Sequence, residues 1–267
     1  MHALDHVVFN TRDRTDQVLA LFAGLGFTVG QRGFHTLGSI NHTIVFGADY
    51  LELLGYPPGA PPPGRPELVE RPIGLMATVL RSADAQATRD ELLRRGLAPR
   101  PVQAFSRPVA LPDGRVEGAA FRVTRLEPDA VPGTWFYYCQ HLTPQWVWRP
   151  EWQVHANRAS AICALSIAVP DPAAALPAYR ACAGLPDTDR DATAGETEIM
   201  LGDCRLQLDR SGDTPGMKAI GFRVDSLDAV KSAARRAGIG FESGATQLHI
   251  DPAASFGAKL QFIVQAG

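Results

Sequence analysis

The order in which strand and helix patterns follow one another repeats four times along this chain of 267 residues, and this repetition limits the fold more than any other feature. In the first repeat, apolar residues alternate over residues 4–10, and an amphipathic pattern follows over 15–23. Asp13 is placed to cap that helix, and Gly24 to stop it where the chain runs into a strand at Phe27. Two more strand patterns, joined by turn residues, cover 40–46 and 50–54. The first repeat therefore predicts the element order β-α-β-β-β.

The other three repeats keep this order, each opening with a strand and a helix and closing with further strands. Such units cannot bury their apolar faces alone, so the repetition predicts modules that pack on one another. The repeats cover 73–80, a helix at 84–95, a hairpin turned at Pro112-Asp113-Gly114 and 134–141; then 161–169, a helix opened by Asp171 and Pro172, 197–201 and 205–208; then 218–224, a helix at 227–237, 247–250 and 258–264.

Two strands of the first module each carry one polar residue able to bind a metal. Alternation places His6 on one face of its strand between Leu4 and Val8, and Glu52 on one face of its strand. If these faces line a common pocket, imidazole and carboxylate converge as two ligands of a divalent metal. In the alternative interpretation His6 hydrogen-bonds a backbone carbonyl and Glu52 pairs with an arginine. An unpaired buried carboxylate is costly, so in either case we expect Glu52 to have a partner.

The segments Leu4-Asp5-His6, 33–41 and Tyr50-Leu51-Glu52-Leu53, set in this module order, resemble the vicinal oxygen chelate superfamily, and within it the glyoxalase-like domain proteins. The superfamily includes glyoxalase I, extradiol dioxygenases and antibiotic-resistance proteins. The resemblance implies an α+β fold of two tandem glyoxalase-like domains, each a pair of βαβββ modules forming a cupped mixed sheet. We expect domains at 1–143 (modules at about 1–56 and 73–143) and 158–267, with an aromatic connector at 144–157.

The same resemblance implies that first and last strands of the modules supply metal ligands. It assigns His6 and Glu52 to such positions, with Glu52 as ligand or catalytic base, and His141 as a candidate third ligand. Two histidines and one carboxylate would suit Fe, Mn, Zn or Ni, although the ligand set is incomplete in the sequence. The corresponding C-terminal positions are taken by residues that are poor ligands for such ions, so we predict no metal there: Ala164, Gln207, Ala219 and Gln261.

Several other polar and aromatic residues are candidates for contact with a substrate. His35 and Asn41 lie near the turn before the third strand, and Trp135 and Tyr137 lie on the closing strand of the second module. Arg149 stands in the stretch 135–152, which holds all four tryptophans, and would suit a carboxylate or phosphate. This stretch is either the aromatic wall of a pocket or packing between the two halves.

Composition excludes several classes of protein. The net charge is −2 and basic residues are scattered, which argues against a nucleic-acid partner. No apolar run approaches the roughly 20 residues of a membrane span, and charged residues interrupt any signal peptide. The four cysteines lack metal or redox spacing, which favours buried, reduced thiols in a cytoplasmic protein.

Two functions of different classes fit these observations. The first is a metal-dependent lyase, isomerase or dioxygenase that acts on a small oxygen-bearing substrate in the N-terminal cup. The alternative is a protein that binds or sequesters a small molecule without metal or chemistry. In either case we expect a small-molecule ligand, and a homodimer is compatible with the sequence.

Overall fold

The computed structural model describes residues 1–111, 114–186, 197–211 and 214–265, and its N-terminal part is an eight-stranded mixed sheet. The sheet order is β2-β3-β4-β1-β5-β8-β7-β6, so the first strands of the two modules, β1 and β5, lie antiparallel at the centre. Of the predicted hairpin turn, residues 112 and 113 lie outside the described residues. The strands are β1 (Leu4–Arg12), β2 (Gly33–Phe34), β3 (Ile40–Val45), β4 (Tyr50–Gly55), β5 (Gly74–Arg81), β6 (Gln103–Ala110), β7 (Val116–Arg125) and β8 (Trp135–His141).

The C-terminal part is a seven-stranded mixed sheet built in the same way. Its order is β10-β11-β9-β12-β15-β14-β13, with β9 and β12 antiparallel at the centre. The predicted α+β class with two curled mixed sheets is therefore confirmed, and we keep 1–143 and 158–267 as our proposed domain boundaries. The strands are β9 (Ala159–Val169), β10 (Glu198–Leu201), β11 (Cys204–Arg210), β12 (Gly216–Val224), β13 (Glu242–Ser243), β14 (Gln247–Ile250) and β15 (Lys259–Val264).

The helices α1, α3, α4 and α5 lie between the first and second strands of the modules and begin close to where the sequence predicted, whereas α2 lies between β4 and β5. Asp84 and Asp171 cap their helices, each accepting hydrogen bonds from two backbone N–H groups of the first turn. The described helices are α1 (Thr15–Gly24), α2 (Pro66–Glu70), α3 (Ala85–Arg94), α4 (Pro172–Cys182) and α5 (Leu227–Arg236), with single 3-10 turns η1 (Pro144–Trp146), η2 (Pro150–Trp152) and η3 (Pro252–Ala254).

Two local predictions for the first module are wrong. Asp13 does not cap α1: Arg14 is the N-cap residue and makes no side-chain cap, while the Thr15 hydroxyl bonds that of Thr11 at 2.8 Å. Phe27 does not start a strand, because its ring packs edge-on against Phe222 of β12 at 4.9 Å instead of alternating along a sheet.

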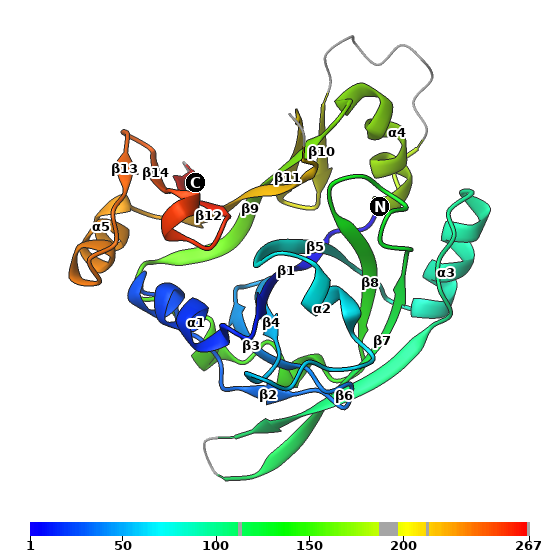
Figure 1. Cartoon of the computed structure of the whole chain (residues 1–267), viewed down its shortest axis with the longest axis horizontal. Helices are drawn as coiled ribbons and strands as arrows, with labels where there is room; N and C mark the ends of the chain where they lie inside the picture. Colours follow the sequence, from blue (N-terminus) through cyan, green and yellow to red (C-terminus); the bar gives the residue numbers. More distant parts are fainter. Residues whose placement is uncertain (112–113, 187–196, 212–213, 266–267) are drawn as a thin grey trace.

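The N-terminal sheet curls until its edge strands β2 and β6 lie side by side, so that it is nearly a barrel (Figure 1). Alternation gives it two faces. Val7 and Phe9 of β1 join the outer core, whereas Val8 joins a separate inner core with residues of β4, β5 and β8. Leu68 of α2 and the partly buried Trp146, Trp148 and Trp152 also pack on this inner core. The later tryptophans therefore do not fill the space between the two halves, as one interpretation of the sequence had it.

The two halves share the outer core. Residues of β1, β4 and β8 and of β9, β11, β12 and β15 belong to one buried cluster. One polar link between the halves reinforces it, since Asp49 in the β3–β4 turn accepts from the backbone N–H of Ile162 at 2.9 Å. His155 of the connector bonds the Val45 carbonyl at 3.0 Å. The inner face of the N-terminal sheet is thus turned away from the C-terminal sheet.

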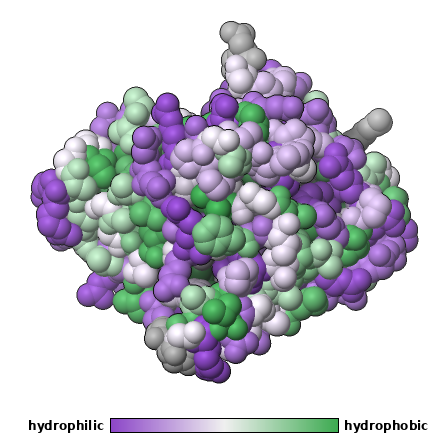
Figure 2. All heavy atoms as spheres, turned by 60° about the horizontal axis from the view of Figure 1, so that its bottom comes forward, coloured by the Kyte–Doolittle hydropathy of each residue, from purple (hydrophilic) through white to green (hydrophobic). Residues whose placement is uncertain are grey.

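The polarity of the surface and the burial of the cysteines agree with what the composition predicted. Figure 2 shows hydrophilic and hydrophobic residues interspersed on one face, with a hollow between them. Within the described ranges, no helix is long and apolar enough to cross a membrane. All four cysteines are free and buried, as the sequence predicted.

Candidate metal and ligand site

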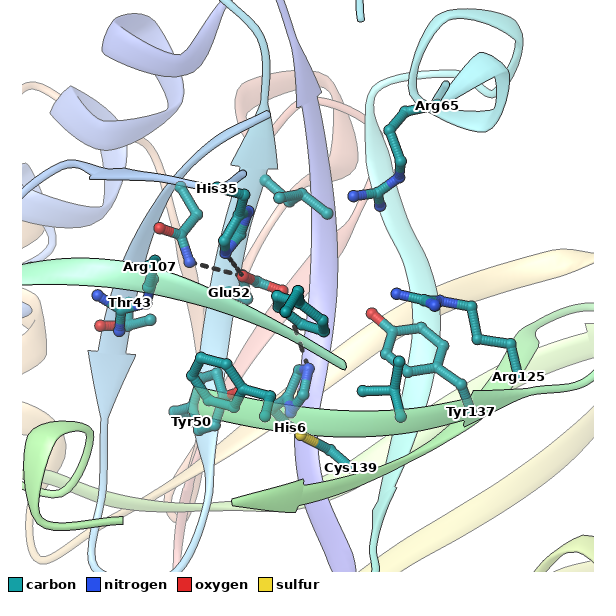
Figure 3. Close-up of a pocket in the computed structure, with 15 residues that line it drawn as sticks. His6, His35, Thr43, Tyr50, Glu52, Arg65, Arg107, Arg125, Tyr137 and Cys139 are labelled. Carbon is teal, nitrogen blue, oxygen red and sulfur yellow. Dashed lines mark hydrogen bonds and ion pairs between the residues drawn. The ribbon is translucent and has the colours of Figure 1, made fainter. Parts of the chain in front are cut away.

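His6, His35 and Glu52 meet in one cavity on the inner face of the N-terminal sheet (Figure 3). His6 comes from β1 and Glu52 from β4, and His35 follows directly after β2. The Nε2 atom of His6 lies 3.8 Å from Oε2 of Glu52, and Nε2 of His35 lies 3.8 Å from Oε1. The structure thus brings together the two residues that the sequence analysis expected to converge, and adds His35, which it had considered only as a substrate contact.

Asp5 orients His6 from behind. Its Oδ1 atom lies 2.7 Å from Nδ1 of His6 and 2.9 Å from Nε2 of His141, and Arg81 donates to Oδ2 at 3.3 Å. Burial would raise the pKa of Asp5, but His141 and His6 outweigh it and hold the pKa well below its ordinary value. An ionised Asp5 fixes the proton of His6 on Nδ1 and leaves Nε2 directed at Glu52.

Glu52 is also ionised and held in place. Burial alone would raise its pKa, but His35, His6, the amide of Asn41 and Arg107 together lower it below the ordinary value. Asn41 donates from Nδ2 to Oε1 of Glu52 at 2.6 Å, while its own Oδ1 is buried without a hydrogen-bond partner among the described residues. The carboxylate is therefore anionic at neutral pH and has a fixed orientation.

His35 is neutral at physiological pH. Burial lowers its pKa to about 4, although Glu52 opposes this shift. Its Nδ1 atom lies 2.9 Å from the hydroxyl of Ser39, which leaves Nε2 towards Glu52. A neutral imidazole that donates from Nδ1 to Ser39 would leave the lone pair of Nε2 for a metal.

His6, His35 and Glu52 offer the ligand types of a divalent-metal site. Their ligand atoms, one from each residue, do not all lie within 4.8 Å of one another, so the three side chains would have to draw together around an ion. Each imidazole has its Nδ1 engaged, by Asp5 or by Ser39, as is usual for metal-binding histidines. Each Nε2 to carboxylate separation of 3.8 Å is shorter than two metal–ligand bonds of about 2.1 Å laid end to end. Two histidines and one carboxylate facing a cavity leave coordination positions open for a substrate.

A second group of metal-binding side chains lies beside the first. Asp5, Cys139 and His141 have ligand atoms within 4.8 Å of one another. Both Asp5 and Cys139 are buried, and burial raises the pKa of the Cys139 thiol well above its ordinary value. Asp5 already accepts from two histidines. The ligand atoms of this second group lie closer together than those of the first, but loading it would require removal of the thiol proton and loss of the Asp5 bonds.

The other predicted site residues divide between the cavity and its surroundings. Tyr137 and Asn41 line the cavity. Trp135 is buried and donates its indole N–H to the Leu126 carbonyl at 2.8 Å, and Arg149 pairs with Glu151 beside Trp146 and Trp152. His141 lies at the end of β8, against Asp5 rather than Glu52.

The sequence analysis missed Asp5 and three arginines that line the cavity, which are Arg65, Arg107 and Arg125. Strict alternation turns Asp5 away from His6, but a register shift between Leu4 and His6 breaks the alternation. Arg65 stands in the proline-rich segment that connects the first two modules. Of these residues, only Arg107 could have been identified from the sequence, because it is a charged residue inside a strand pattern.

Gly33 allows β2 to approach the site closely. A Cβ atom there would lie 2.3 Å from Oδ1 of Asn41 and 3.1 Å from Cδ of Arg107, so Asn41 would have to move. We expect Gly33→Ala to cost about 1–3 kcal/mol of stability and to weaken ligand binding, because Asn41 would no longer hold Glu52. Thermal unfolding and metal titration measure both effects. Gly47→Ala is the control, because nothing lies within 4 Å of its added Cβ, and an equal effect of both changes would contradict the prediction.

The pairing register supports the comparison of the two halves. Glu52 pairs with Val8, two residues beyond His6, and Gln207 pairs with Ser166, two residues beyond Ala164. Ala164 and Gln207 therefore occupy the positions that correspond to His6 and Glu52. The absence of metal from the C-terminal half stays a prediction.

Comparisons with known proteins agree with this architecture. No curated protein sequence matches the chain. A hypothetical protein from Staphylococcus aureus is similar in structure, with a TM-score of 0.73 and 11% identity, over 99% of this chain and 100% of that one. A xylose isomerase-like TIM barrel/4-hydroxyphenylpyruvate dioxygenase fusion protein has a TM-score of 0.63 and 14% identity. The match covers 99% of this chain and 50% of the fusion protein. A mutant of 4-hydroxymandelate synthase from Streptomyces coelicolor has a TM-score of 0.61 and 13% identity, over 100% of this chain and 94% of that one.

At these identities the structural likeness concerns the fold. The sequence match is more specific, because the model of the glyoxalase-like domain family covers residues 4–183, which is more than half of the chain and includes every residue of the site. This chain belongs to the glyoxalase-like domain family.

Proposed function

We propose that this protein is a metal-dependent enzyme of the vicinal oxygen chelate type, acting on a small oxygen-bearing substrate in the N-terminal cavity. One observation carries the proposal: two imidazole Nε2 atoms lie 3.8 Å from the oxygens of one buried, ionised carboxylate, on the wall of a cavity. His6, His35 and Glu52 would hold the metal. In this arrangement Asp5 and His141 act as positioning residues that orient His6.

A bound divalent metal would supply Lewis acidity to adjacent oxygens of the substrate. The chain's own residues prepare the site. Asp5 keeps the proton of His6 on Nδ1, and Asn41 holds the Glu52 carboxylate in one orientation. The buried surroundings keep bulk water away and strengthen each charge interaction. One similar structure is, by name, a fusion protein that includes a 4-hydroxyphenylpyruvate dioxygenase, and this name supports a dioxygenase as one class, beside a lyase or isomerase.

Metal content tests the proposal. The purified protein, treated with chelator and then loaded separately with Fe, Mn, Zn and Ni, should bind about one equivalent of at least one of these metals, measured by mass spectrometry. His6→Ala and Glu52→Ala should each abolish this binding, since both remove a ligand. Gln207→Ala, at the corresponding position of the C-terminal sheet, should leave it unchanged.

Cys139→Ser distinguishes the two groups of ligands. We expect it to retain the metal, because Cys139 contributes nothing to the proposed set. Loss of metal in Cys139→Ser with retention in His35→Ala would place the ion at Asp5, Cys139 and His141 instead. A wild-type protein that binds none of the four metals would refute the enzyme proposal and favour the alternative, a metal-free protein that sequesters a small molecule.

A further inference from the structure

The cavity carries more positive than negative charge. Three arginines line it, whereas Glu52 is the one carboxylate in the lining that the described residues provide. Arg65 pairs with Glu67 just outside the cavity, and Arg107 lies close enough to Glu52 to lower its pKa. Arg125 forms no ion pair with a described residue and donates to the neutral side chain of Gln103 at 2.8 Å. One guanidinium therefore lacks a counter-ion.

The uncompensated charge is also partly buried. Burial lowers the pKa of Arg125 and the neighbouring charge of Arg65 lowers it further, while Tyr137 and Glu67 oppose the shift without cancelling it. Desolvation of a guanidinium beside a like charge is costly unless an anion offsets it. Among the described residues Glu67 offsets this charge only in part and is already paired with Arg65, so the cost points to an anion that enters from outside the chain.

Arg65, Arg125 and Tyr137 are arranged to receive such an anion. Figure 3 shows their side chains on one side of the cavity, across from His35 and Glu52. The guanidinium of Arg125 lies 5.5 Å from the centre of the Tyr137 ring. The Tyr137 hydroxyl makes no hydrogen bond within the described part of the chain, so its proton is available to a ligand. Two guanidinium groups and a phenol offer converging donors.

We propose that Arg65, Arg125 and Tyr137 form a subsite for a carboxylate group of the substrate, across the cavity from His35 and Glu52. The inference rests on the proposed function for the role of that carboxylate, since it would hold one end of a substrate whose oxygens face the metal ligands. The substrate class is then a small organic acid.

The size of the cavity favours a short acid. Its volume of about 40 Å³ corresponds to roughly three water positions, at about 10–15 Å³ each on this measure. A planar carboxylate matches the fork of a guanidinium with two parallel hydrogen bonds. A phosphate group is bulkier and needs donors on more sides.

Binding of small acids to metal-free protein tests the subsite. Calorimetric titrations at constant ionic strength would compare acetate and malonate with acetamide, which has the size of acetate without its charge, and with inorganic phosphate. We expect the carboxylates to bind and acetamide not to bind. Equal binding of acetate and acetamide would overturn the proposal, and phosphate binding more tightly than either carboxylate would overturn the assignment to carboxylic acids.

Variants locate the binding. Arg125→Gln should weaken acetate binding at least tenfold, because it removes a charge-assisted hydrogen bond. Tyr137→Phe, which keeps the buried ring, should weaken it about three- to tenfold. Arg122→Gln is the matched control from the same strand, since Arg122 does not line the cavity. Equal losses in Arg122→Gln and Arg125→Gln, or unchanged affinity in Tyr137→Phe and Arg125→Gln, would refute the subsite.

The test is independent of the metal. Carboxylate binding that depends on Arg125 in a protein that never takes up metal would keep the subsite and refute the proposed enzyme. Metal binding without carboxylate binding would support the proposed enzyme and refute the subsite. Circular dichroism and the melting temperature of each variant show whether it has folded, and Tyr137→Phe remains informative if Arg125→Gln does not fold.

Discussion

Asp5→Asn is expected to weaken metal binding by about 10- to 100-fold and to lower the free energy of unfolding by about 3 kcal/mol. Asp5 is fully buried, and its carboxylate accepts from His6 and His141 and lies within reach of Arg81. An amide has the same shape but only one acceptor and no charge. The histidines would lose their common anionic partner, and the Nδ1 proton of His6 would lose its strongest acceptor.

Two measurements check this prediction. Competition with a chelator of known affinity gives the change in metal binding, and denaturant unfolding gives the change in stability. Asp209→Asn is the control, because Asp209 is exposed and accepts from Ser166 on the C-terminal sheet. Unchanged metal affinity in Asp5→Asn would show that Asp5 does not orient a metal-binding histidine, whatever happens to stability.

Asp49→Asn is expected to stabilise the protein, and to do so more at pH 8 than at pH 5. Burial raises the pKa of Asp49 from its ordinary value of 3.8 to about 7, although the Ile162 N–H bond and Arg81 oppose the shift. The folded state therefore holds a proton that the unfolded state releases, so the wild type loses stability as the pH rises from about 4 through 7. The difference between pH 5 and pH 8 corresponds to roughly 2–3 kcal/mol.

The Asn side chain can still accept from Ile162, so the substitution removes the charge and keeps the link between the two halves. Melting temperatures of both proteins at pH 5, 6, 7 and 8 would reveal a gap that widens with pH. Asp203→Asn is the control, because Asp203 directly precedes β11 as Asp49 directly precedes β4, and it is exposed. A constant gap across this range would show that Asp49 does not titrate there.

The sequence by itself determined the order of elements and the faces of the strands. Periods of two and of 3.6 residues are local properties, so the strand of His6, the strand of Glu52 and the capped helix after Asp171 follow from neighbouring residues. The two predicted ligands share a face because β1 and β4 pair in parallel within one module. Because the β-α-β-β-β order repeats, the same reasoning predicted the elements of the other three modules.

Only the tertiary structure decided what surrounds those two residues. Nε2 of His35 lies 3.8 Å from Oε1 of Glu52 because β2 pairs with β3 and β3 with β4, and a register shift places Asp5 behind His6. Arg65 and Arg125 stand 60 positions apart in the chain, yet both line one cavity because the sheet curls round α2. Such contacts depend on sheet curvature, register and loop path, which are set by packing between distant segments, whereas sequence patterns report only on near neighbours.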